Sequence, residues 1–256
     1  SRRPILIDQE RLLKHSHSDM KAKSLRNFLG GKNKPILYDV WGSRTGRLAT
    51  KTGSFPIMNL KKELADVVIP KNNIFIQFDL NGAEIRTLLS LSTGTHPRED
   101  VHEYNIKNVY RGIGTRDKAK KRFFAWLYNP NAEDHLTERY YNKTKVLKKF
   151  YSNGEIYTPF GRKIQSDDFH ALNYLLQSTS SDNCMMQCVK INKFLRHTNS
   201  FVHSVVHDSL TIDLDLNDRH LLPQIQEIFE DTHLGWFKSS VHVGHNLKDM
   251  LEVSWS

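Results

Sequence analysis

The chain has 256 residues, of which 37 are Lys or Arg and 28 are Asp or Glu, giving a formal net charge of +9. Hydrophobic residues make up 38% and charged residues 25% of the chain, and the mean hydropathy is −0.55. This composition suits a soluble folded core and excludes a disordered protein, and no apolar run reaches the roughly 18 residues of a membrane span. The positive charge favours a polyanionic partner, nucleic acid before an anionic membrane surface.

The cysteines and the first residues bear on the cellular setting. Cys184 and Cys188 are the only two cysteines, which excludes a disulfide framework and a four-cysteine zinc site and indicates a reducing compartment. They lie one helical turn apart and suit core packing better than redox chemistry. The opening SRRPILIDQE contains neither Met nor an apolar signal core, so we expect a trimmed or fragmentary chain.

Turn residues and hydrophobic periodicity predict the elements in chain order. Residues 1–35 carry nine Lys or Arg against three Asp or Glu, which indicates a basic helical arm. The apolar runs predict a strand over 74–79, a strand, tight turn and strand over 201–213, and a last strand over 239–245. Between them we expect helices over 82–92, 100–111, 116–128, 132–151, 168–197 and 221–234, with a hairpin-like excursion around 153–161. Strands at both ends of a helical middle indicate an α+β fold with an antiparallel sheet assembled from distant segments.

Two acidic residues stand where the apolar strands end. Asp79 ends the first predicted strand, and Asp208 lies in the turn between two later strands. As a pair they would hold Mg²⁺, which takes one or two carboxylates together with substrate phosphates. Taken singly, either residue is more simply explained as the polar end of a strand at a solvated turn.

The segment TRDKAKKRFFAWLYN predicts a helix with a mixed cationic and aromatic side. Arg116, Lys120, Phe124 and Tyr128 recur at four-residue spacing and share that side. The cations would neutralise a triphosphate, and the rings would press on sugar and base. The alternative is a surface helix with its aromatics in the core and its cations in solvent, and periodicity alone favours it. His102, on the preceding helix, would donate to a phosphate, although a single His is more often a bystander.

The order of these segments resembles the palm and fingers of family A DNA polymerases, the family of bacterial DNA polymerase I and of the replicative polymerases of short-tailed phages. The resemblance covers about residues 36–253. FDLNGAEIRTL resembles the first motif of the family. It implies Asp79 as a metal ligand, Leu80 as a backbone carbonyl ligand and Glu84 as the gate beneath the sugar.

The same resemblance gives the fingers helix a function. RDKAKKRFFAWLYN is similar to the helix in which Arg116 and Lys120 hold the triphosphate. Phe124 would then lie against the sugar, and Tyr128 would guard the templating position. DVH resembles the segment that lends His102 to the triphosphate.

Three further motifs resemble the parts of the family that contact primer and template. VHDSL is similar to the third motif, which implies Asp208 as the second metal carboxylate and His207 near the primer terminus. TGRLAT implies a minor-groove role for Arg47, and HALNYLLQS implies that Asn173 and Gln177 touch the primer-template. The closing VHVGHNLKDM also resembles the last segment of the family.

The resemblance implies a right-hand polymerase fold that adds deoxynucleotides to a primer 3′ end, with two Mg²⁺ ions at the carboxylates and Lys120 among the catalytic residues. Its partners would be primer-template DNA and deoxynucleoside triphosphates, with no membrane, in the cytoplasm of a bacterial or phage-infected cell. The expected domains are an N-terminal arm or thumb remnant (1–35), the palm (36–95 and 165–256) and the fingers (96–164).

The sequence also departs from the family pattern. Ser209 follows the second carboxylate where the family usually has Glu, and Asn129 stands where Gly commonly follows the motif Tyr. The fingers are short, residues 1–35 are too few for a full thumb, and no segment resembles a proofreading exonuclease. We therefore expect a larger parent protein or a separate partner chain. Two alternatives stay open: a single-subunit RNA polymerase, against which Glu84 argues, and a catalytically lapsed nucleic-acid-binding module.

Overall fold

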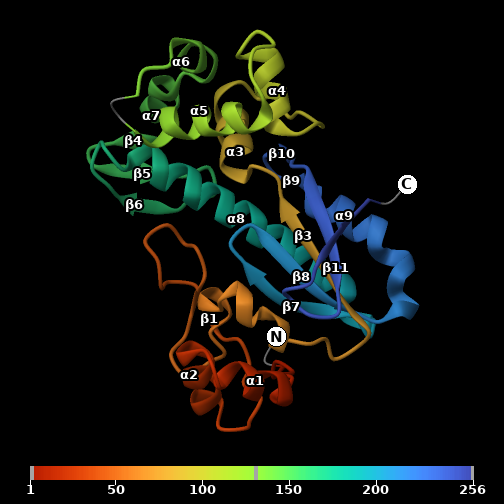
Figure 1. The fold of residues 1–256 in the computed structure, drawn as a ribbon. Helices are drawn as coiled ribbons and strands as arrows, with labels where there is room; N and C mark the ends of the chain where they lie inside the picture. The colour runs from red at the N-terminus through yellow and green to blue at the C-terminus, as the bar shows by residue number, and fades with distance from the viewer. Residues whose placement is uncertain (1–2, 130–131, 255–256) are drawn as a thin grey trace.

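The computed structural model describes residues 3–129 and 132–254. A five-stranded antiparallel sheet, in the order β12-β11-β3-β8-β7, lies at its centre (Figure 1). The strands of this sheet are β3 (Ile74–Leu80), β7 (Phe201–Val206), β8 (Ser209–Leu214), β11 (Ser239–Gly244) and β12 (Leu251–Val253). The predicted α+β class is confirmed, as are all of these strands except β12, which the sequence analysis did not predict.

Helices and short strands surround the sheet. The described residues form the helices α1 (Gln9–Ser16), α2 (Met20–Leu29), α3 (Ala83–Ser92), α4 (Val101–Asn108), α5 (Arg116–Tyr128), α6 (His135–Tyr141), α7 (Lys143–Phe150), α8 (Ala171–Phe194) and α9 (Leu222–Glu230). The short strands are β1 (Tyr38–Asp39), β2 (Ala49–Thr50), β4 (Tyr151–Ser152), β5 (Glu155–Tyr157), β6 (Lys163–Gln165), β9 (Asp231–Thr232) and β10 (Gly235–Trp236). None of the described helices is both long and apolar enough to cross a bilayer.

Strand β3 shows how the two faces of the central sheet are covered and where one of them is open. Successive side chains of a strand point to opposite faces, and Ile76, Phe78 and Leu80 pack in a core that α8 and α9 share. Phe75 and Asp79 therefore point to the other face. Phe75 is covered there by the N-terminal segment, whereas Asp79, near the end of the strand, is exposed. The open part of this face is thus at the Asp79 end of β3.

The upper lobe in Figure 1 contains α4 to α7 and the small sheet β4-β5-β6. Its core includes Phe123 and Trp126 of α5 and also Leu175 from the first half of α8. The prediction of one helix over 132–151 is wrong, because Asn142 divides it into α6 and α7. Asn142 adopts φ +49, and its side chain accepts a hydrogen bond from the amide of Lys145 at 3.0 Å, so it ends one helix and caps the next.

The basic N-terminal segment is helical, as predicted, and lies at the bottom of Figure 1. Asp8 and Asp19 cap α1 and α2 by accepting hydrogen bonds from first-turn amides, and Gly30 ends α2 in the left-handed conformation. An isolated bridge joins Ile7 to Val68, and both lie in a core that includes Phe75 of β3. The segment therefore packs directly onto the central sheet.

Truncation of Phe75 tests this packing. Its side chain is 0% exposed, so we expect Phe75→Ala to lower the free energy of unfolding by about 3–5 kcal/mol. Phe169→Ala, at a side chain that is 64% exposed, should change it by about 0.5 kcal/mol or less. Urea denaturation followed by circular dichroism measures both, and equal effects would show that the N-terminal segment is not packed on the sheet.

Candidate active site

Asp79 and Asp208 lie side by side at one end of the central sheet. Asp79 is opposite Ser209 in the pairing of β3 with β8, and the amide of Leu80 donates to the carbonyl of Asp208 at 3.1 Å. His207 and Asp208 form the tight turn between β7 and β8, in which His207 adopts φ +52. A side chain in this left-handed region costs about 1–2 kcal/mol, so the turn that presents Asp208 is strained.

Nearby cations do not offset the burial and mutual repulsion of the two carboxylates. Burial, followed by the charge of Asp208, raises the pKa of Asp79 to about 6, although its side chain still reaches solvent and His242 of β11 acts in the opposite direction. Burial also raises the pKa of Asp208, against the lowering effect of Arg47 and His207. A divalent cation between the two side chains would relieve this repulsion.

The protein supplies few side-chain ligands for such a cation. In residues 3–129 and 132–254, no group of three or more His, Cys, Asp and Glu side chains is placed to hold a metal ion. Mg²⁺ needs only one or two carboxylates when substrate phosphates and water complete its octahedral shell. Asp79 and Asp208 therefore fit Mg²⁺ better than a zinc-type site, and a backbone oxygen such as that of Leu80 would be an additional ligand.

Glu84 and Arg47 complete this part of the site. Glu84 lies in the first turn of α3, and Arg47 donates to its carboxylate at 2.7 Å. Burial raises the pKa of Glu84, Arg47 lowers it, and Asp208 raises it further. These mutual effects place Glu84 near Asp208. We call Asp79, Asp208, Glu84 and Arg47 the carboxylate cluster.

Helix α5 presents the predicted stripe on its outer side. Ala119, Phe123, Trp126 and Leu127 are buried, whereas Arg116, Lys120 and Tyr128 are exposed and Phe124 is partly buried. The rings of Phe124 and Tyr128 stack with centroids 5.7 Å apart and an interplanar angle of 4°. The core thus takes the aromatic residues outside the stripe, and the stripe itself combines solvated cations with a stacked aromatic pair.

Asp100 joins the stripe to His102. Its carboxylate accepts hydrogen bonds from the amides of His102 and Glu103 at the start of α4 and forms an ion pair with Arg116 at 2.8 Å. The His102 side chain is buried, and its ring lies 6.1 Å from that of Phe124. Burial lowers the pKa of His102 to about 4, so the ring is neutral at pH 7.

His102 has a free polar atom that suits a phosphate oxygen. Its Nδ1 is buried and has no hydrogen-bond partner within the described part of the chain. The positive charges of Arg116 and Lys120 both lower the pKa of the His102 ring. We call Arg116, Lys120, Phe124, Tyr128 and His102 the α5 cluster.

Arg86 connects the two clusters. Its side chain is 1% exposed and donates to the backbone carbonyls of Asn81, Pro97 and Glu99 at 2.6–2.7 Å. It thereby fixes the end of β3 to the segment that leads into Asp100. The sequence analysis assigned no function to Arg86, although a cation within an apolar helical run was a signal that it is buried.

Gly82 permits a second close contact between the same elements. It adopts φ +63, and a Cβ at this position would lie 2.6 Å from Cγ1 of Val101 in α4. A larger residue would therefore push α4 away from the end of β3. This contact and Arg86 fix the α5 cluster relative to Asp79.

The residues predicted to contact primer and template are less closely connected. Gln177 donates to Asn173 at 2.5 Å on α8, and no hydrogen bond or ion pair in the described residues joins either side chain to the two clusters. Both share a helix face with buried Cys184. Cys188 and burial raise the pKa of the Cys184 thiol, and the charges of Asp208 and Asp79 raise it further, which places Cys184 near the two carboxylates. The helical rise places Asn173 about 16 Å from Cys184 along α8. His207 is exposed at its turn.

Three contributors to the site were missed from the sequence. Asp100 precedes Glu103 by three residues, which is an N-cap pattern, but its ion pair with Arg116 joins two helices. His242 lies near enough to Asp79 to lower its pKa because β11 pairs with β3. Cys184 lies near enough to Asp79 and Asp208 for their charges to raise its pKa because α8 covers the sheet. No sequence signal specified the last two contacts.

No protein-family model matches the sequence, and no curated protein sequence is similar to it. The structure matches the POL domain of Pol1 from M. smegmatis, determined in complex with DNA primer-template and dNTP, with a TM-score of 0.67 and 14% identity. The fold resembles that of a polymerase domain. The match covers 93% of this chain and 51% of the other, so the chain spans about half the length of that polymerase chain. At this identity the likeness establishes the fold alone.

The raised pKa of Asp79 predicts that the candidate site lowers stability. Asp79 shifts from its ordinary value of 3.8 to about 6, so the folded state binds the proton more tightly. The resulting stability is present below about pH 4 and is lost as the pH rises through about 6. Without metal at about pH 8, we expect Asp79→Asn to raise the free energy of unfolding by about 1 kcal/mol, since solvent screening weakens the full effect.

Urea denaturation in EDTA at about pH 8 and pH 4 measures this effect, with exposed Asp231→Asn as the control. Most of the stabilisation should disappear near pH 4, where the wild-type carboxyl is almost fully protonated in the folded state. An Asp79→Asn variant that is less stable than the wild-type protein at about pH 8 would contradict the arrangement.

Proposed function

We propose that the chain is the catalytic region of a template-directed DNA polymerase, which adds deoxynucleotides to a primer 3′ end by two-metal-ion nucleotidyl transfer. One observation carries the proposal: two adjacent carboxylates, Asp79 and Asp208, at the open end of a sheet in a polymerase-like fold. The central sheet with α8 and α9 would be the palm, and the lobe of α4 to α7 would be the fingers.

Asp79 and Asp208 would hold two Mg²⁺ ions. When bound, these ions would lower the pKa of the primer 3′ hydroxyl for in-line attack and stabilise the departing pyrophosphate. The protein contributes the alignment of the two carboxylates through the pairing of β3 with β8. Because their charges repel, the pair favours a proton or a cation, which supports this role.

The α5 cluster would bind the triphosphate. Arg116 would exchange the carboxylate of Asp100 for phosphate oxygens, which are also anionic acceptors. Lys120, which forms no ion pair in the described part of the chain, would offset charge that develops on the leaving group. Neutral His102 would hydrogen-bond a phosphate oxygen through its free Nδ1. Closure of α5 would exclude water from the site.

Glu84 would determine the choice of sugar. The resemblance puts this residue beneath the ribose, where it would fill the space of a 2′ hydroxyl and exclude ribonucleotides. Its ion pair with Arg47 and its burial hold the carboxylate in place. This position supports a DNA polymerase over a single-subunit RNA polymerase.

The open face of the palm sheet would receive the primer-template. Arg47, Asn173, Gln177 and His207 would contact the DNA, and the net charge of +9 would give salt-dependent affinity without sequence preference. Under this proposal, a thumb or exonuclease region, or a partner chain, would complete the enzyme.

Primer extension with Asp208→Asn tests the metal site. We expect the rate of templated dNTP addition with Mg²⁺ to fall by about a thousandfold or more, because the metal supplies several kcal/mol of transition-state stabilisation. Primer-template affinity measured in EDTA should not decrease, since Asn removes a negative charge near the DNA. Asp231→Asn should extend like the wild-type protein.

The same assay on the wild-type protein, with deoxy- and ribonucleotides, distinguishes three outcomes. Templated DNA product is expected. Templated RNA product would identify an RNA polymerase, and binding of primer-template without any extension at low salt would identify a module that has lost catalysis. Either of the last two results overturns the proposal.

Substitution of Glu84 tests the sugar gate. Glu84→Ala should lower the ratio of kcat/KM for dNTP over the matched NTP by about tenfold or more, because the space for a 2′ hydroxyl opens. Glu84→Gln keeps the size of the side chain and should retain most of the discrimination. Single-nucleotide insertion kinetics give both ratios, and an unchanged ratio in Glu84→Ala would show that another group selects the sugar.

A further inference from the structure

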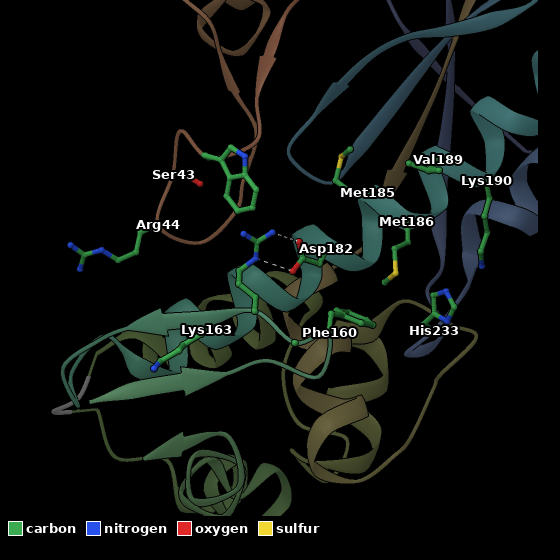
Figure 2. Close-up of a pocket in the computed structure, with 13 residues that line it drawn as sticks. Ser43, Arg44, Phe160, Lys163, Asp182, Met185, Met186, Val189, Lys190 and His233 are labelled. Carbon is green, nitrogen blue, oxygen red and sulfur yellow. Dashed lines mark hydrogen bonds and ion pairs between the residues drawn. The ribbon is translucent and has the colours of Figure 1, made fainter. Parts of the chain in front are cut away.

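A groove separate from both clusters runs along the outer side of α8. It encloses about 890 Å³, and its walls come from four segments that are distant in sequence (Figure 2). These segments are the turn after β1, the connection between β5 and β6, the second half of α8 and the turn between β9 and β10. We call this feature the α8 groove.

The middle of the α8 groove is apolar and aromatic. Met185, Met186 and Val189 of α8 face it, with Phe160 opposite, as Figure 2 shows. Trp41 also lines the groove with 82% of its surface exposed, and Val189 is 47% exposed. An exposed Trp beside further apolar side chains is an unusual surface for a protein with no ligand there.

Cations lie at both ends of this apolar surface. Figure 2 places Arg44 and Lys163 toward one end and Lys190 toward the other. Arg44 and Lys190 form no ion pair within the residues that the structure describes, whereas Lys163 pairs with Glu155 at 2.8 Å. The groove therefore combines aromatic faces with positive charge.

The single acid of the lining is already neutralised. Asp182 accepts two hydrogen bonds from Arg162, at 3.0 and 2.7 Å. Gly46 packs on this ion pair, because a Cβ there would lie 2.5 Å from the guanidinium carbon of Arg162. The wall of the groove is thus fixed before any ligand binds, and its net charge is positive.

The groove leads toward the predicted DNA-binding end of α8. The guanidinium of Arg44 lies 5.6 Å from the ring centre of Tyr174, the neighbour of Asn173. The lining includes no member of the carboxylate cluster or the α5 cluster. A strand that left the region of Asn173 would therefore meet the groove without entering the site of catalysis.

We propose that the α8 groove binds a single, unpaired strand of DNA. Its bases would stack on Trp41 and Phe160, and its phosphates would contact Arg44 and Lys190, the combination by which proteins hold single strands without sequence preference. An apolar peptide would use the middle of the groove but leave its cations unmatched. Under the proposed function the strand is unpaired template, but its binding requires no catalysis.

Fluorescence anisotropy with a labelled oligothymidylate tests the proposal. An oligonucleotide of about 12 nucleotides is suitable, because single-strand binding sites cover lengths in this range. We expect Trp41→Ala to weaken binding about tenfold and Trp41→Phe to restore most of the affinity, because stacking needs a ring. The thermal melt of each variant is measured alongside, and a melt that matches that of the wild-type protein excludes unfolding as the cause of weaker binding. Leu251→Ala, at a side chain that is 74% exposed outside the groove, is the matched control.

The salt dependence tests the cations independently. Arg44→Ala combined with Lys190→Ala should reduce the slope of log K against log salt by about 1.4, since each single-strand phosphate contact contributes about 0.7. Lys23→Ala combined with Arg219→Ala removes two exposed charges elsewhere and should leave the slope nearly unchanged.

The outcomes separate this proposal from the proposed function. Equal oligonucleotide binding by wild-type protein, Trp41→Ala and the Arg44/Lys190 double variant would overturn the groove assignment, as would a groove that binds only an apolar peptide. Asp208→Asn should bind the oligonucleotide like the wild-type protein although its extension activity is lost. Groove-dependent binding by a protein without any extension activity would sustain the groove and overturn the polymerase.

Discussion

The pairing of β3 with β8 is the constraint on which the site depends. It sets Asp79 opposite Ser209 and brings Asp208, in its strained turn, next to the end of β3. The two negative charges repel, and the raised pKa of Asp79 expresses that cost. The buried side chains on the other face, Phe78 and Leu80, hold the register against this repulsion. The arrangement thus sacrifices local stability to keep two carboxylates together, which is typical of a functional site.

A buried cation transmits this geometry to the upper lobe. Arg86 has no carboxylate hydrogen-bonded to it in the described residues, and backbone carbonyls from two segments hold its guanidinium instead. Because carbonyls fix direction as well as distance, Arg86 sets where the chain enters α4. Asp100 continues the connection by capping α4 and pairing with Arg116. The position of α5 therefore depends on contacts that begin at the end of β3.

The sequence was sufficient to predict those parts of the site in which a local pattern and a chemically distinctive residue coincide. The strand that ends at Asp79, the turn at His207 and Asp208, and the side of α5 that carries Lys120 all follow from short-range periodicity. Contacts between distant segments did not follow: the break at Asn142 depends on a left-handed residue within a helical pattern, and the proximity of His242 to Asp79 depends on strand pairing. The roles of the site residues rest on the resemblance, to which the structure adds their proximity.

The cations of the protein divide by their partners. Arg86 donates three hydrogen bonds and Arg162 donates two to oxygens of the chain, and their removal would leave these acceptors unsatisfied. Arg44, Lys120 and Lys190 have no such oxygen in the described part of the chain and remain solvated. The first group builds the walls of the site and of the α8 groove, whereas the second can release water and counterions when a phosphate arrives. Under the two proposals, positive charge would contribute to binding where the fold leaves it unpaired, and the net charge alone does not locate those positions.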